Sequence, residues 1–148
     1  MMRLQVRRHT YNNLGGVIHE KSHRFCCTSA GRRPQCDPML VAQDVIRCYE
    51  AGASMVHLHV RDRQGNLTED LTCLKETVEA IRKKADMVIE VSTGGVSGLN
   101  IQQRCAPLEY SMVELASLNV GSINLGEAVY QNPLQDVRYC MEQIKKHR

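Results

Sequence analysis

From Asp37 onward, segments with the pattern of helices alternate with segments that have the pattern of strands. Helical spacing marks residues 39–53, 67–85, 100–111 and 132–148, and short apolar runs typical of strands lie at 54–60, 86–95 and 112–126. This order predicts βαβ units and a parallel sheet. Two α/β architectures satisfy it, an open doubly wound sheet and part of a (β/α)₈ barrel. In both of them ligands bind at the C-terminal ends of the strands.

The start of the ordered domain is expected at Asp37, where an acidic N-cap is followed by a proline at the first helical position. Gly52 is expected to end this helix in a left-handed conformation. Residues 1–36 have weak periodicity, and no strand is recognisable in them. We therefore expect a divergent or poorly ordered segment over 1–36 and one domain over 37–148.

Composition excludes several classes of function. The net charge of +3, the absence of Trp and the single Phe argue against a nucleic-acid-binding surface. No apolar run approaches the roughly 20 residues that a membrane span needs. The chain has seven cysteines without a CxxC pair, which favours reduced thiols in a cytoplasmic protein over a disulfide framework. No GxGxxG sequence follows the first clear strand, which argues against a dinucleotide site.

Two histidines stand two positions apart in the predicted strand "SMVHLHV". Because side chains alternate across a strand, His57 and His59 share one face and lie roughly 7 Å apart at their Cβ atoms. Neutral imidazoles suit Zn, Fe, Ni or Cu, so this pair is a candidate metal site. The alternative is a pair of hydrogen-bonded core histidines. A catalytic zinc usually has three protein ligands, so two histidines alone are too few.

Arg61 and Asp62 follow this strand directly. They are candidates for holding an anionic substrate and for orienting a histidine. An ion pair that braces the loop is the equally weighted alternative.

Polar residues also mark the ends of the two later strands. In "EVSTGG", Glu90 and Ser92 share a face, and the glycines Gly94 and Gly95 allow backbone N–H groups to approach an anion. An ordinary βα turn is the alternative.

In "ELASLN", Ser117 and Asn119 are expected on one face of a strand that should otherwise be apolar. Buried polar groups need hydrogen-bond partners, which a ligand or neighbouring residues of a barrel would supply.

Taken together, "EAGASMVHLHVRD", "IEVSTGG", "RCAPLE" and "ELASLNVGSINLG" resemble the β-keto acid cleavage enzymes, of the 3-keto-5-aminohexanoate cleavage type known from lysine degradation. The resemblance runs from about Pro38 to about Pro133 in matching order. It implies a (β/α)₈ TIM barrel and Zn²⁺ held by His57 and His59. It also implies substrate binding by a set of residues at the strand ends: Ser92, Gly95, Ser117 and Asn119.

The implied reaction is an acyl transfer in which a β-keto acid and acetyl-CoA give acetoacetate and a new CoA thioester. Zinc would bind the keto and carboxylate oxygens and stabilise developing enolate charge. In the family, a third zinc ligand (a Glu) and an Arg and Asp that assist the chemistry come from the second half of the barrel. The corresponding positions would lie beyond Arg148, so the chain is expected to be an N-terminal half.

Two other functions remain open. The chain could be a metal- or ligand-binding α/β module without catalysis, or one subunit of a split barrel that is active only with a partner chain. A half-barrel exposes sheet edges and one sheet face. We therefore expect a homo-oligomer or another association that covers them.

Overall fold

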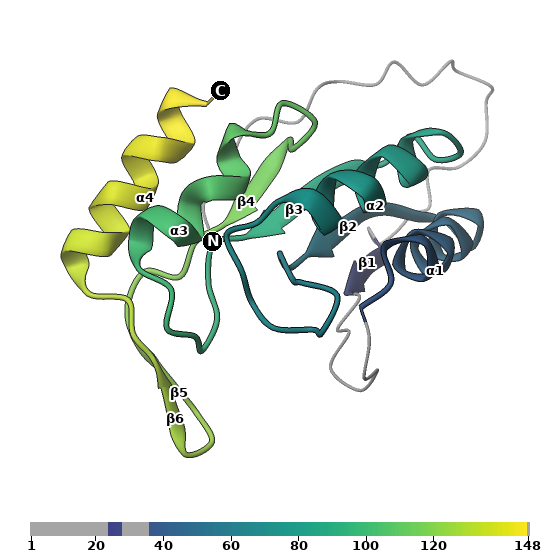
Figure 1. Cartoon of the computed structure of the whole chain (residues 1–148). Helices are drawn as coiled ribbons and strands as arrows, with labels where there is room; N and C mark the ends of the chain where they lie inside the picture. The colour runs from purple at the N-terminus through teal and green to yellow at the C-terminus, as the bar shows by residue number, and fades with distance from the viewer. Residues whose placement is uncertain (1–23, 28–35, 148) are drawn as a thin grey trace, which may run out of the picture.

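The computed structural model describes residues 24–27 and 36–147 (Figure 1). Its elements, in chain order, are β1 (Arg24–Cys27), α1 (Pro38–Glu50), β2 (Ala53–Leu58), α2 (Thr72–Arg82), β3 (Val88–Ser92), α3 (Ile101–Cys105), the 3₁₀ helix η1 (Ala106–Glu109), β4 (Leu115–Ser117), β5 (Ile123–Leu125), β6 (Ala128–Tyr130) and α4 (Leu134–Lys146). The predicted alternation of helices and strands from Asp37 onward is confirmed. No helix in this part of the chain is both long and apolar enough to cross a membrane.

Helix α1 begins and ends where its sequence predicts. The Asp37 carboxylate accepts a hydrogen bond of 2.8 Å from the Met39 N–H, and Pro38 occupies the first turn. The Asp37 side chain thus provides a hydrogen-bond partner for one N–H group of the first turn. Pro38 leaves no N–H group without a partner at its own position, because proline has none. At the other end Gly52 has a φ of +98°, a left-handed conformation that glycine adopts without steric cost.

A parallel four-stranded sheet forms the centre of the fold, in the order β1-β2-β3-β4. Each strand therefore lies beside the next strand along the chain. The register pairs His57 with Glu90 and Ser92 with Ser117. In a parallel sheet, paired residues project from the same face. The polar residues of the three strands are thus brought onto one face.

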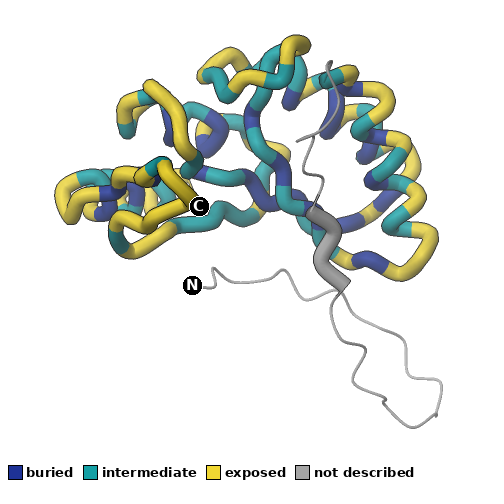
Figure 2. The backbone as a smooth tube through the Cα atoms, turned by 90° about the horizontal axis from the view of Figure 1, so that it is seen from below, coloured by how far each residue is buried: buried dark blue, intermediate teal, exposed yellow. Residues whose placement is uncertain are grey.

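The two faces of the sheet differ in burial. One face packs against the helices and forms the core, where Val56, Ile89 and Val91 are fully buried. Helix α1 contacts both α2 and β2, and Figure 2 shows the buried residues gathered along the strands and the inner faces of the helices. The opposite face carries the buried Glu90 and otherwise half-buried residues: Met55, His57, Val88, Ser92, Leu115 and Ser117.

Two elements depart from the sequence-based predictions. Strand β1 lies within residues 1–36, where no strand was recognisable, and it pairs with β2. The rest of that segment, apart from Cys36, lies outside the described residues. The second departure follows β4, which ends at Ser117. Residues beyond it form an antiparallel hairpin, β5–β6, that projects away from the four-stranded sheet (Figure 1). The pattern of residues 112–126 predicted one strand that runs into a glycine-containing loop, whereas this segment contains β4 and also β5, the first strand of the hairpin.

Replacing Asp37 with Ala should lower the free energy of unfolding by about 1 kcal/mol, because the Met39 N–H loses its acceptor. Urea unfolding followed by circular dichroism measures this change. Asp37→Asn is the matched control, since Asn caps helices as well as Asp does and should keep wild-type stability. An unchanged urea midpoint in Asp37→Ala would show that this cap does not stabilise α1.

Candidate functional site

The two predicted histidine positions lie together at the C-terminal end of β2. The rings of His57 and His59 have centroids 5.1 Å apart and planes inclined at 79°. His57 belongs to the sheet, whereas His59 lies one residue past the end of β2. Glu90 of β3 lies beside them, with its Oε2 atom 3.3 Å from His57 Nδ1. The structure therefore brings together two imidazoles and one carboxylate on the same face.

The surroundings of His59 favour its neutral form. Burial, followed by the charges of His57 and Arg61, lowers the pKa of His59 to about 4, so its imidazole is neutral at physiological pH. Neutral imidazole is the form that binds a metal ion. Two buried side-chain atoms in the described part of the chain have no hydrogen-bond partner, and both belong to this cluster: His59 Nδ1 and Glu90 Oε2.

Each of these two atoms carries a desolvation cost that a bound cation would remove, because it is buried and polar without a partner. The set of possible metal ligands is nevertheless incomplete. No group of three or more His, Cys, Asp or Glu side chains among residues 36–147 has the geometry of a metal site. The described residues thus offer the two-histidine part of a site.

The loop after β3 places Ser92 next to the histidines. Ser92 Oγ accepts a hydrogen bond of 3.2 Å from the Gly94 N–H, so the hydroxyl shapes the turn. Ser92 and His59 line the same small cavity. Gly95 has a φ of +146°, and a Cβ atom there would lie 2.7 Å from a methyl carbon of Leu67. Both its conformation and its surroundings therefore favour glycine.

The other two predicted substrate-binding residues, Ser117 and Asn119, lie in different places: Ser117 is the last residue of β4, and Asn119 lies in the loop that follows. Ser117 pairs in register with Ser92 and is half-buried. Asn119 is exposed, because the chain has already left the sheet, and its carbonyl accepts a hydrogen bond from the Asn132 side-chain amide. The expectation that Ser117 and Asn119 share one strand face is therefore wrong. Asn119 enters the loop that leads to the hairpin.

Arg61 and Asp62 bond within their own loop. Arg61 donates a hydrogen bond of 2.6 Å to the Gly65 carbonyl, and the Asp62 carboxylate accepts one of 2.8 Å from the Asn66 N–H. Hydrogen bonds from Asn66, its side chain first, hold the pKa of Asp62 below its usual value. These contacts favour the loop-bracing interpretation.

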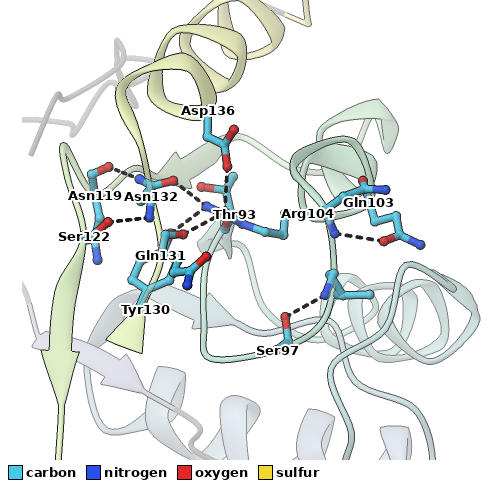
Figure 3. Close-up of polar contacts among 12 residues, drawn as sticks. Thr93, Ser97, Gln103, Arg104, Asn119, Ser122, Tyr130, Gln131, Asn132 and Asp136 are labelled. Carbon is cyan, nitrogen blue, oxygen red and sulfur yellow. Dashed lines mark hydrogen bonds and ion pairs between the residues drawn. The ribbon is translucent and has the colours of Figure 1, made fainter. Parts of the chain in front are cut away.

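Arg104, which lies in α3 and is only 8% exposed, was not among the predicted site residues. Figure 3 shows its guanidinium at the meeting point of the β3 end, the hairpin and α4. It bonds to the Thr93 carbonyl at 2.9 Å and to the Tyr130 hydroxyl and Asn132 Oδ1 at 2.8 Å each. Its weaker polar contacts are with the Gln131 carbonyl and Asp136.

This network joins the two loops that carry the candidate ligand-binding residues. Thr93 donates a hydrogen bond of 2.5 Å to the Ser117 carbonyl, so Arg104 holds the ends of β3 and β4 together through Thr93. Tyr130 packs so closely on Gly94 that a Cβ atom there would meet its hydroxyl. One feature of the sequence could have indicated the role of Arg104. It is a charged residue in the short, partly apolar segment "RCAPLE", and no acidic residue stands three or four positions before it to form an ion pair along the helix.

Comparison with known proteins identifies relatives of this chain. The sequence profile of the β-keto acid cleavage enzyme family matches residues 36–148. The chain is 40% identical over 87 residues to the 3-keto-5-aminohexanoate cleavage enzyme of Fusobacterium nucleatum, an alignment that covers 58% of this chain and 32% of that protein.

Two further relatives have other names. The 3,5-dioxohexanoate:acetyl-CoA acetone transferase of Paraburkholderia graminis is 31% identical over 111 residues, which cover 74% of this chain and 35% of that protein. The 3-oxoadipate:acetyl-CoA acetyltransferase of Cupriavidus necator is 37% identical over 100 residues, covering 67% and 34% respectively. The matched region of this chain thus spans about a third of the length of these curated relatives.

Replacing Arg104 with Met should lower the free energy of unfolding by about 3 kcal/mol, because buried acceptors lose their charged donor. Hydrogen exchange should also accelerate in the amides of the hairpin region, residues 119–133. Urea unfolding and exchange mass spectrometry measure the two effects. Arg138→Met, at an exposed position of α4, is the matched control. Equal stability of the two variants would contradict a joining role for Arg104.

Proposed function

Because this chain belongs to the family of β-keto acid cleavage enzymes, we propose that it carries part of the active site of a zinc-dependent acyl transfer. In this reaction a β-keto acid and acetyl-CoA give acetoacetate and a new CoA thioester. The observation that carries the proposal is the convergence of His57, His59 and Ser92 at the C-terminal strand ends, on the face that the helices leave open. This is where α/β folds of both candidate architectures bind ligands.

The proposed architecture is the first part of a (β/α)₈ barrel, with residues 37–148 as its domain. The strand order supports this choice. A doubly wound sheet reverses its strand order at a switch point, whereas β1 to β4 follow one another without reversal. The unequal faces also support it, since an inner barrel face is lined by side chains from neighbouring strands. Residues 24–27, which precede the proposed domain boundary, contribute β1 to the same sheet.

His57 and His59 would hold the zinc ion. When bound, zinc acts as a Lewis acid that polarises a carbonyl oxygen and stabilises the negative charge that develops on it. The neutral imidazole of His59 supports this role, as does its buried Nδ1 atom without a partner.

The neighbouring loops would bind and orient the keto acid. Ser92 offers a hydroxyl beside His59, with which it lines one cavity. Gly95, three residues further along the same loop, is proposed to let the backbone approach the substrate. Ser117 continues this polar row on the next strand. Asn119 is proposed to contact substrate from the loop after β4, and its exposure leaves its side-chain amide accessible. Arg104 keeps these loops in position through Thr93 and Asn132.

The substrate class follows from what the relatives' names share. The names 3-keto-5-aminohexanoate, 3,5-dioxohexanoate and 3-oxoadipate each describe a carboxylic acid with an oxo group at position 3. Two of the relatives are also named for acetyl-CoA. A β-keto acid and acetyl-CoA are accordingly the proposed substrates here.

A second candidate function rests on the incomplete donor set. Since residues 36–147 offer no group of three metal-binding side chains, the chain alone suits a non-catalytic metal-binding module or one subunit of a split barrel. In the active assembly, a third ligand and the acid–base residues would then come from other segments. Assaying acetyl-CoA with a β-keto acid, with and without a chain that supplies the remaining strands, distinguishes these alternatives from an independently active enzyme.

The double variant His57→Ala, His59→Ala should lose Zn²⁺ binding, because both proposed ligands are removed. Competition with a chromophoric chelator measures the loss. His147→Ala is the control, since this histidine is exposed at the end of α4 and should leave affinity unchanged. Retention of zinc by the double variant would refute the proposed metal site.

We also expect the chain to associate with further copies of itself or with another chain. Among the described residues the sheet ends in the edge strands β1 and β4, and its polar face is mostly half-buried rather than buried. Sedimentation velocity should therefore detect species larger than a monomer. A monomer that also melts cooperatively in calorimetry would contradict this expectation.

A further inference from the structure

We propose that Cys105 and Cys140 form a redox-sensitive thiol pair, which hydrogen peroxide oxidises to a disulfide that joins α3 to α4. Both residues belong to the hydrophobic core of the domain. Neither of them belongs to the proposed metal site or substrate site, so this role is independent of the proposed function.

The fold brings the two cysteines together from separate helices. Cys105 is the last residue of α3, and Cys140 lies in the middle of α4, which packs against α3 (Figure 1). Among the cysteines whose side chains the structure describes, these two are the buried ones, with 5% and 0% of their surface exposed. Their thiols are hydrogen-bonded to each other. Sulfur atoms in such contact need only a small movement to reach the disulfide bond length of about 2.05 Å.

The surroundings of the pair give the two thiols different roles. The hydrogen bond with Cys140, together with burial, raises the pKa of Cys105. The same hydrogen bond lowers the pKa of Cys140 to about 7 against the effect of burial, and contact with Thr93 and the charge of Arg104 act in the same direction. Cys140 therefore carries the thiolate, which is the form that attacks an oxidant. Cys105 keeps its proton and is placed as the resolving cysteine.

The proposed oxidation proceeds in two steps. The Cys140 thiolate attacks one oxygen of hydrogen peroxide, the O–O bond breaks, and the hydroxide that leaves takes up the proton that Cys140 has lost, which gives a sulfenic acid and water. The sulfur of Cys105 then attacks the sulfur of Cys140 and gives up its proton. The S–O bond breaks, and the hydroxide leaves with this proton as a second water. Two electrons pass from the two sulfurs to the peroxide.

The attachment of α4 explains how a small oxidant reaches a buried thiol. The buried residues of α4 are Val137 and Cys140, so a narrow strip of side chains holds this helix to the domain. Local opening of an element with few buried contacts costs less free energy than global unfolding. After oxidation, the disulfide would fasten α4 to the residue that follows Arg104. Because Arg104 joins the ends of β3 and β4 through Thr93, oxidation should also stiffen the loops at these strand ends.

Peptide mapping of the 148-residue chain tests the pair directly. Trypsin cleaves after Arg104 and Arg138, and no Lys or Arg stands between them, so the two cysteines fall in the separate peptides 105–138 and 139–145. After peroxide treatment and blocking of free thiols, these peptides should appear joined and two hydrogen atoms lighter, and dithiothreitol should separate them. No joined peptide, or pairing of Cys105 and Cys140 with other cysteines as often as with each other, would overturn the proposal.

Single variants test which cysteine reacts first. In Cys105→Ser, which keeps a hydrogen-bond donor but cannot resolve, Cys140 should gain one oxygen atom that dithiothreitol removes. In Cys140→Ser, Cys105 should stay unoxidised under the same conditions. Cys73→Ala removes a half-buried thiol of α2 and is the matched control, in which the joined peptide should form as in the unmodified chain. Equal oxidation of the remaining cysteine in the two serine variants would contradict the assigned roles.

Oxidation should also raise stability, because the disulfide closes the loop between residues 105 and 140. The urea midpoint of the peroxide-treated chain should rise by about 1 M. Hydrogen exchange of the amides in 119–133 should slow. Dithiothreitol should reverse both effects, which separates them from methionine oxidation, because it does not reduce methionine sulfoxide. An unchanged midpoint in a chain that contains the disulfide would refute the fastening of α4. If a serine variant does not fold, the peptide map of the unmodified chain decides.

Discussion

The in-register pairing of β2, β3 and β4 is the constraint on which the rest of this structure depends. Parallel pairing sets His57 beside Glu90 and Ser92 beside Ser117, and the two-residue period of each strand then divides the residues between two faces. The apolar half meets the helices and provides the core, including Val56. The polar half converges at the C-terminal strand ends. A shift of one residue would exchange the two faces and remove both the core and the site.

The buried guanidinium group of Arg104 supports the loops that follow these strands. Backbone carbonyls at strand ends need donors when they are buried, and Arg104 has enough directed N–H groups to serve several of them at once. The Thr93 hydroxyl extends this support to Ser117. Rigid support of this kind matters for a site built on loops, because ligand-binding groups act only when their geometry is held. The hairpin β5–β6 is attached to the domain through the same network.

Local patterns predicted much of this fold. The Asp37-Pro38 start and the Gly52 end of α1 were predictable because caps depend on neighbouring residues alone. The shared face of Glu90 and Ser92 followed from strand alternation. Asn119 was misplaced because alternation was extended past Ser117, where the chain leaves the sheet. Strand β1 was missed because the pattern of its own residues does not indicate a strand. Its pairing with β2 is what defines it as one.

The sequence by itself determined the order of the elements from α1 to β4, the α/β class and the family, because these depend on local spacing and on linked motifs. It also placed His57 and His59 close together, although His59 lies one residue past the end of β2. Only the tertiary structure decided that Glu90 lies beside His57 and that Arg104 joins the ends of β3 and β4. These contacts connect segments far apart in the chain. Which residues meet in such contacts depends on how the strands align and how the helices pack, and no single segment of the sequence specifies this.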